Sequence, residues 1–169
     1  RYYTPSGRLI QRPWDGTFDE YLTYTLREQD PNKAHKPEDL KLTDGGRTVY
    51  GGGGITPDVN VPPVKSNHFQ DTLLQHYAFF NFAKRYVVKN TVAKTFTVDD
   101  GLMQEFRKFL DEEKIPYTEQ DLVENNDWLR YSIKSEVFVD QFGQDEGLKI
   151  RAENDPQIIK ALDLLPQAR

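Results

Sequence analysis

Hydrophobic and polar positions follow two different patterns along the chain. In the first third, short β-prone runs alternate with turn residues. From about Ser66 to the end, apolar residues recur every three or four positions, which is the period of a helix with one buried face. The glycine run Gly51–Gly54 lies between the two patterns. We therefore predict an α+β fold, with a small β-rich N-terminal portion over residues 1–64 and a helical C-terminal portion over residues 65–169.

Two hairpins are predicted in the N-terminal portion. The residues from Arg1 to Thr4 are β-prone, a Pro-Ser-Gly turn follows them, and residues 8–11 resemble a return strand. Residues 40–43 and 47–50 flank an Asp-Gly-Gly sequence, which is a strong local hairpin signal. Between the hairpins, helical spacing of apolar residues predicts a helix over residues 17–28. A short extended segment is predicted over residues 55–61.

The first and longest predicted helix of the C-terminal portion begins at Ser66 or Asn67, either of which can serve as its cap. Its aromatic residues are numerous enough to suggest burial on more than one side. The predicted apolar stripe comprises Phe69, Leu73, Tyr77, Phe80 and Val87, widened by Phe79, Phe82 and Tyr86.

Three further helices are predicted from their caps. One begins near residues 97–99 and ends before Pro116, because a proline disfavours helical geometry in the residue that precedes it. The next opens with a capping box from Thr118 to Asp121 and ends at Gly143. The last, over residues 157–165, opens with Asp155-Pro156. Their inward-facing residues are predicted to be Leu102, Phe106, Phe109, Leu110, Leu122, Leu129, Ile133, Val137, Ile158, Ile159, Leu162 and Leu165.

Composition excludes several classes of function. The chain of 169 residues carries a formal net charge of -5, which argues against a nucleic-acid partner because such proteins normally present a basic face. It has no cysteine, so a disulfide scaffold, a thiol nucleophile and a zinc–thiolate site are excluded. No apolar run approaches the length needed to cross a bilayer.

The glycine run invites comparison with a phosphate-binding loop. Such a loop ends in Lys-Ser or Lys-Thr at a helix N-terminus, so that backbone amides and a cation both face the anion. Here Ile55-Thr56-Pro57 follows the glycines, with no lysine and no helix start. We therefore interpret Gly51–Gly54 as structural glycines of a turn or bulge that permit close approach of another backbone.

No catalytic or metal-binding set is recognisable among the other polar residues. The histidines are too few and too poorly spaced for a metal site, and the serines are predicted to lie in turns, in caps or on helix surfaces. The carboxylate groups are predicted to lie at a helix start and on a polar helix face, as solvated structure. These residues are His35, His68 and His76; Ser6, Ser66, Ser132 and Ser135; and Asp99, Asp100, Asp111, Glu112 and Glu113. We predict no catalytic, cofactor-binding or metal-binding residue.

Two short motifs stand in a fixed order in the N-terminal portion. The first is Tyr-Thr-Pro-Ser-Gly over residues 3–7, and the second is Gly-Ile-Thr-Pro-Asp over residues 54–58. Together they resemble the segment that follows the active site in the carboxyl-terminal processing (tail-specific) serine proteases. The helical remainder is similar in style to the C-terminal tails of some members. The insertion from Asp15 to Lys41 is longer than in compact members and has no assigned role.

The resemblance implies that the chain is the C-terminal fragment of a Ser–Lys endopeptidase that acts on cell-envelope proteins and is located in the periplasm or the cell envelope. A β-prone sequence that begins directly at Arg1 agrees with a fragment. In the family the Ser nucleophile, the Lys general base and a PDZ-like domain all lie upstream of the first motif, so none falls within this chain. We expect the fragment to be inactive alone, to need no cofactor, and to meet protein or peptide substrates only through the upstream part.

Two other hypotheses come from the residues themselves. The helical portion could be a non-catalytic interaction or regulatory module, because aromatic residues such as those of residues 69–86 are enriched at interfaces; their helical spacing equally predicts core positions. The whole chain could also be a free-standing binding protein whose motifs are coincidental. Finally, an unpaired edge on the strand from Arg1 to Thr4 predicts self-association.

Overall fold

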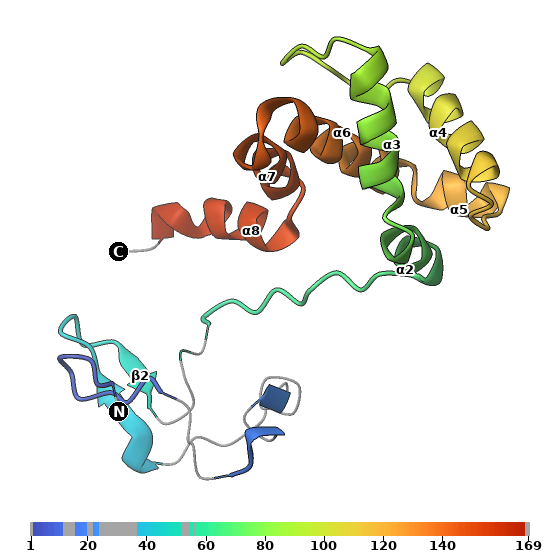
Figure 1. The fold of residues 1–169 in the computed structure, drawn as a ribbon. Helices are drawn as coiled ribbons and strands as arrows, with labels where there is room; N and C mark the ends of the chain where they lie inside the picture. Colours follow the sequence, from blue (N-terminus) through green and yellow to red (C-terminus); the bar gives the residue numbers. More distant parts are fainter. Residues whose placement is uncertain are drawn as a thin grey trace. The chain divides into compact units, whose positions relative to one another are not determined.

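The computed structural model describes residues 2–11, 16–19, 22–23, 37–51, 55 and 57–167 of the chain. The chain divides into two compact units, Arg1–Asn60 and Val61–Arg169. The first unit contains the strands and the second is helical (Figure 1). The predicted α+β fold, with a small β part followed by a helical portion, is confirmed.

Both predicted hairpins are present in the first unit. Strands β1 (Leu40–Leu42) and β2 (Thr48–Tyr50) form a two-stranded antiparallel sheet, and the 3-10 helix η1 (Pro37–Asp39) leads directly into β1. In the N-terminal hairpin, Tyr3 pairs with Leu9 in a single antiparallel bridge.

Two other predictions for the first unit fall largely outside the described residues. Of the helix predicted over residues 17–28, only positions 17–19 and 22–23 are described, and 18–19 and 22–23 are helical. The extended segment predicted over residues 55–61 bends at Asp58 and Val59 and forms no strand at its described positions.

The second unit has seven α-helices within its described residues, joined by short connections (Figure 1). Helix α6 is the longest and packs most extensively against α3 and α7. The elements are α2 (His68–Gln75), α3 (Ala78–Lys89), α4 (Asp100–Glu112), α5 (Glu119–Glu124), α6 (Asn126–Phe142), α7 (Gln144–Glu153), α8 (Pro156–Leu164) and the 3-10 helix η2 (Leu165–Gln167).

An aromatic cluster forms the centre of the helical core. The fully buried Phe106 ring stacks on Phe79 with centroids 5.6 Å apart and meets Phe82 edge-on at 5.1 Å. Phe79 also meets Trp128 edge-on at 5.1 Å, so α3, α4 and α6 converge on one cluster. Stacked and edge-to-face pairs are the arrangements that aromatic rings prefer. Around the cluster lie Phe69, Leu73, Ala78, Ala83, Val92, Leu102, Phe109, Leu110, Ile115, Leu129, Ile133 and Val137.

The first predicted helix is divided in two, so the prediction of one continuous helix is wrong. Asn67 caps α2, and its side chain accepts a hydrogen bond from the Gln70 backbone N–H at 2.9 Å. Tyr77 then takes a left-handed conformation with φ of 51°, which separates α2 from α3. Because the chain turns there, Tyr77 and Phe80 are exposed instead of facing the core. Helix α3 buries Ala78, Phe79, Phe82 and Ala83.

Local hydrogen bonds end α4 at Glu112, before the predicted end at Ile115. Lys114 takes a left-handed conformation with φ of 56°. The Ile115 N–H then donates to the Leu110 carbonyl at 2.9 Å, and the Lys114 N–H donates to the Asp111 carbonyl at 3.2 Å. These two bonds define a Schellman motif, which also brings the buried Ile115 side chain back toward the end of the helix.

The third predicted helix also divides in two, at Asn125. The capping box of Thr118 and Asp121 opens α5 as predicted, and Gly143 ends α6 with φ of 96°. Asn125 lies between them and is 4% exposed. Its Oδ1 accepts hydrogen bonds from Asn67 Nδ2 at 2.9 Å and Gln70 Nε2 at 2.8 Å. Its Nδ2 donates to the Asp121 carbonyl at 2.8 Å, so every polar atom of this buried amide is paired.

Helix α7 has no counterpart in the sequence prediction, and its backbone packs closely against α6. A Cβ atom at Gly147 would lie 2.2 Å from Val139 Cγ2 and 2.8 Å from the Ser135 carbonyl oxygen. The Ser135 hydroxyl donates to the Gly147 carbonyl at 3.1 Å and accepts a hydrogen bond from Arg151 Nε at 2.9 Å. Ser135 is therefore a buried contact between helices, which corrects its predicted place on a helix surface.

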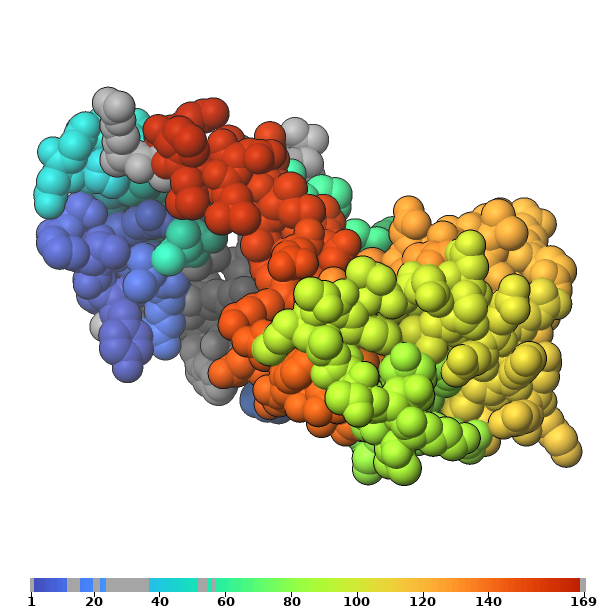
Figure 2. Space-filling model, turned by 90° about the horizontal axis from the view of Figure 1, so that it is seen from above, coloured from blue at the N-terminus to red at the C-terminus, as the bar shows by residue number. Residues whose placement is uncertain are grey.

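The last helix has the predicted cap but does not dock as predicted. Asp155 caps α8 through bonds to Gln157 and Ile158, and Pro156 occupies the first helical position. The predicted docking residues remain exposed because the described helices of this unit leave that face of α8 uncovered; Figure 2 shows α8 in red. Their exposed fractions are 41% for Ile158, 44% for Ile159, 59% for Leu162 and 61% for Leu165.

Replacing Asn125 should destabilise the helical unit far more than replacing a matched exposed asparagine. Asn125→Ala leaves the side-chain amides of Asn67 and Gln70 without their acceptor, at a cost of about 1–3 kcal/mol. Asn154 makes a comparable side-chain bond to the carbonyl four residues earlier, but it is exposed. Asn154→Ala should therefore cost about 0.5 kcal/mol or less. Urea unfolding followed by far-ultraviolet circular dichroism measures both variants, and equal losses would contradict this role of Asn125.

Candidate functional site

The tyrosine–threonine–proline–x–glycine motif forms a tight hairpin turn that Thr4 closes. The Thr4 N–H donates to the Arg8 carbonyl, and the Gly7 N–H donates to the Thr4 carbonyl, each at 2.9 Å. The Thr4 hydroxyl oxygen accepts the Arg8 N–H at 3.2 Å. Gly7 has φ of 75°, a conformation that glycine adopts at little cost. The motif is thus a three-residue loop closed by a threonine side chain.

The second hairpin repeats this construction. The Thr43 N–H donates to the Arg47 carbonyl at 2.9 Å, and the Gly46 N–H donates to the Thr43 carbonyl at 2.8 Å. The Arg47 N–H donates to the Thr43 hydroxyl oxygen at 3.1 Å, and Gly46 also has φ of 75°. Both turns have the sequence Thr-x-x-Gly-Arg, so one pattern predicts both geometries.

Gly51, directly after β2, and Asp58, the last residue of the second motif, both lie against these hairpins. A Cβ atom at Gly51 would lie 3.4 Å from the Leu9 amide nitrogen, so this glycine allows the N-terminal hairpin to approach the end of β2 closely. The remaining glycines of the run, residues 52–54, lie outside the described residues. The Asp58 carboxylate, which ends the motif, forms an ion pair with Arg47 of the hairpin.

The histidines and serines form no catalytic or metal-binding set within the described part of the chain. His68 begins α2 and His76 follows its end, whereas His35 lies outside the described residues. Ser6 lies in the first turn, and Ser66 donates to Asp71 at 2.5 Å beside the α2 cap. No cluster of three or more His, Cys, Asp or Glu side chains that could hold a metal occurs among the described residues.

The carboxylates singled out in the sequence lie at the two ends of α4, and several of them have partners in the described structure. Asp99 caps α4 by accepting the Leu102 N–H at 2.8 Å, and Asp100 forms an ion pair with Arg130. At the other end of α4, Glu112 and Glu113 both face Arg85 of α3.

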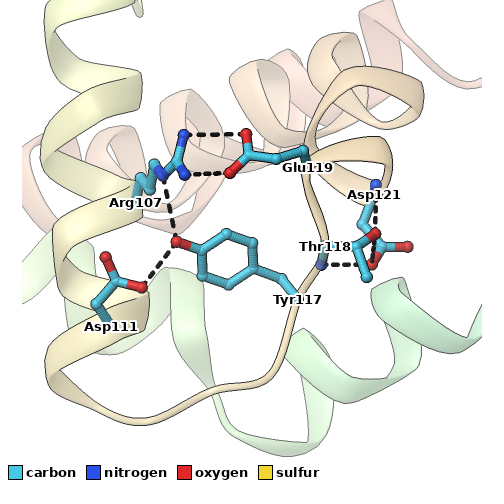
Figure 3. Close-up of polar contacts among 6 residues, drawn as sticks. All are labelled: Arg107, Asp111, Tyr117, Thr118, Glu119 and Asp121. Carbon is cyan, nitrogen blue, oxygen red and sulfur yellow. Dashed lines mark hydrogen bonds and ion pairs between the residues drawn. The ribbon is translucent and has the colours of Figure 1, made fainter.

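The most connected polar cluster joins the end of α4 to the start of α5 (Figure 3). Arg107 binds both carboxylate oxygens of Glu119 and donates from Nε to the Tyr117 hydroxyl at 3.2 Å. Tyr117 donates in turn to Asp111 Oδ1 at 2.7 Å. Burial and the neighbouring Asp111 raise the pKa of Tyr117, while Arg107 opposes that shift. The four side chains form one continuous chain of contacts, from Glu119 through Arg107 and Tyr117 to Asp111, so this cluster connects α4 to the start of α5.

A second polar cluster connects Lys94, in the loop after α3, to helix α7. Glu146 accepts hydrogen bonds from Lys149 at 2.6 Å and from Lys94 at 2.5 Å. These two bonds lower the pKa of Glu146 from 4.5 to about 2. The Lys94 ammonium also lies 4.2 Å from the centroid of the Phe142 ring, a favourable cation–π distance.

A shallow groove of about 200 Å³ lies between α3 and α4. Its charged residues nearly balance, and it contains no serine, histidine or threonine that could act as a nucleophile or base. The groove is lined by Phe82, Arg85, Tyr86, Lys89, Asn90, Glu105, Lys108, Phe109 and Glu112.

Comparison with known families gives one match. Residues 69–121 match the family model described as "Probable PDZ-protease, C-terminal helical domain". The matched residues run from α2 through α3 and α4 into the start of α5, and they include Arg107 and the phenylalanines of the aromatic cluster but not Trp128. The match indicates a PDZ-protease C-terminal helical domain and fits the C-terminal fragment of a processing protease, as the two motifs predicted. No curated protein and no solved structure matches the chain.

No helix in the described part of the chain is long and apolar enough to cross a bilayer. The aromatic residues considered for an interface, Phe69, Phe79 and Phe82, are 4–5% exposed and belong to the core. The core interpretation of these residues is confirmed, and they offer no surface to a partner.

Acid should remove the stabilisation that the Glu146 cluster provides. Because the pKa of Glu146 is lowered in the folded state, this contribution is complete above about pH 4.5 and is lost as the pH falls toward 2. The difference in unfolding free energy between the unmodified chain and Glu146→Gln should therefore narrow across this range. Glu153→Gln, on the same helix, is the control, because Glu153 forms no ion pair with a described residue. A difference that does not change with pH would contradict the role of Glu146.

Proposed function

We propose that this chain is the C-terminal part of a carboxyl-terminal processing serine endopeptidase of the Ser–Lys type that acts on cell-envelope proteins, in the periplasm or the cell envelope. The observation that carries the proposal is the order of features in one chain. The two protease-like motifs come first, and helices that match a PDZ-protease C-terminal domain follow them.

The first unit would then be a scaffold for catalytic residues that lie elsewhere. The closed turns at Thr4 and Thr43 fix the register of two hairpins, and Gly51 lets them approach each other. We infer that these strands extend a sheet that holds the upstream Ser and Lys. A Lys serves as a general base only where burial or neighbouring charge lowers its pKa. The surrounding strands must therefore hold this side chain in place and keep water away from it.

The helical unit would support the protease without contributing to its chemistry. Its buried polar side chains, Asn125 and Ser135, form hydrogen bonds between helices. In its exposed clusters at Arg107 and Glu146, the charged side chains form ion pairs and hydrogen bonds with one another. This agrees with a chain that is inactive on its own.

Peptidase assays on two proteins test the assignment. The 169-residue chain should not cleave an unstructured protein substrate, whereas the longer product of the same reading frame should. Replacing the upstream serine by alanine should abolish cleavage at unchanged folding, because the nucleophile is removed. Cleavage by the 169-residue chain alone, or a longer product that lacks a Ser–Lys pair, would contradict the proposal.

One observation favours the second candidate, a non-catalytic helical interaction or regulatory module. The exposed apolar face of α8 is an unusual feature for a helix of a folded unit. This candidate becomes the leading one if the longer reading frame encodes no serine–lysine pair.

We further propose that copies of the fragment associate through the strand that begins at Arg1. In its described part, Tyr3 pairs with Leu9 without exchanging hydrogen bonds, so the Tyr3 backbone groups face away from the hairpin. Sedimentation at high concentration should show oligomers, and Tyr3→Pro should shift them toward monomer because proline removes the outward donor. A strictly monomeric mass would overturn this association.

A further inference from the structure

The outer edge of β1 presents unpaired backbone groups. The Asp39 carbonyl accepts the Gly51 N–H at 2.8 Å, and the Thr43 N–H donates to the Arg47 carbonyl at 2.9 Å. Hydrogen-bonded pairs alternate along an antiparallel ladder, so residues 39, 41 and 43 face β2. The N–H and C=O groups of Leu40 and Leu42 therefore face away from β2, and they bond to none of the described residues.

The side chains on this edge have a defined pattern. Leu40 and Leu42 lie on one face of β1 and are 45% and 56% exposed. Lys41 lies on the opposite face, across from Val49; its ammonium group donates to the Glu38 carbonyl at 3.4 Å and makes no ion pair with a described residue. The edge thus offers two donors, two acceptors, two apolar side chains and one cation.

A two-stranded sheet is also an incomplete structure. Sheets of two strands are marginal in water, and three or more strands with a covered face are needed for independent stability. Extended peptides commonly bind to such edges as an added strand, with main-chain hydrogen bonds for affinity and alternate side chains for specificity.

We propose that the outer edge of β1 binds an extended peptide segment as a third, antiparallel strand, with a carboxylate residue flanked by apolar residues. The flanking residues exchange backbone hydrogen bonds with Leu40 and Leu42 and cover their side chains. The central residue lies opposite Lys41 in a pair without hydrogen bonds, where side chains are closest, so its carboxylate pairs with the ammonium group.

Lys41 also explains why a second copy of β1 is not the occupant. In an antiparallel pair of two β1 strands with Leu40 opposite Leu42, the two Lys41 residues would lie directly opposite each other. Like charges at opposed positions are destabilising, and lysine on an edge strand is a common protection against self-pairing.

This inference goes beyond the proposed function and does not depend on it, because strand binding is measured without peptidase activity. The probe is the synthetic peptide acetyl-Ser-Thr-Val-Glu-Val-Thr-Ser-amide, added to the isotopically labelled 169-residue chain. On binding, the amide protons of Leu40 and Leu42 should become protected from solvent exchange, and cross-strand proton contacts to the peptide should appear. The protection of Val49 should change little, because its amide already faces β1.

Two variants test the chemistry of the edge. Lys41→Glu should reverse the preference between the probe and its Glu→Lys counterpart, by about two- to tenfold in each direction, as expected for one cross-strand charge pair. Leu42→Pro removes an outward donor that β2 does not use, so it should weaken binding and leave the β1–β2 contacts intact.

Three results would overturn the proposal. The first is protection of Leu40 and Leu42 that depends on protein concentration and not on peptide, which would identify a second copy as the occupant. The second is an unchanged preference between the two peptides in Lys41→Glu. The third is binding of equal strength to Leu42→Pro with β1 and β2 still paired.

Discussion

The helical unit depends on the ring stack around Phe106. Helices α3, α4 and α6 meet there, because Phe79 and Phe82 come from α3, Phe106 from α4 and Trp128 from α6. Burial of one large aromatic side chain is worth about 1.5–3 kcal/mol, so this cluster supplies a large share of the stability of so small a unit. The family match covers α3 and α4 and ends before α6. The stack therefore joins the matched segment to the helices that follow it.

Buried polar side chains whose hydrogen bonds are made then fix the contacts between the helices. Asn125 connects the cap of α2 to the junction of α5 and α6, and Ser135 connects α6 to α7. Both side chains are buried with all of their main hydrogen bonds made, which is the condition under which a buried polar group does not destabilise a core. In the first unit, the threonine hydroxyls at Thr4 and Thr43 have a similar role, because each replaces a missing backbone partner inside a turn.

Sequence reasoning succeeded where a local signal exists. Caps at Asn67, Asp99, Thr118 and Asp155 were predictable because short side chains reach the free N–H groups of a first turn. It failed at Tyr77 and Asn125, where the periodicity continues but tertiary packing bends the chain. It also missed α7, whose buried residues are only Gly147 and Ile150 and therefore give almost no apolar period. The place of Asp99 and Asp100 at a helix start was predictable from the sequence, whereas the burial of Ser135 depends on α7, which the apolar pattern does not reveal.

The contact at Gly147 fixes more than the distance between α6 and α7. A hydrogen atom is the largest substituent that fits between this backbone and Val139, while the neighbouring positions of α7 carry Glu146 and Leu148. If α7 slid along α6 by one residue, a full side chain would occupy a space that has no room for a methyl group. The single absent Cβ therefore sets the longitudinal register of the two helices, independently of salt and pH, and the ion pairs on their surface follow from that alignment.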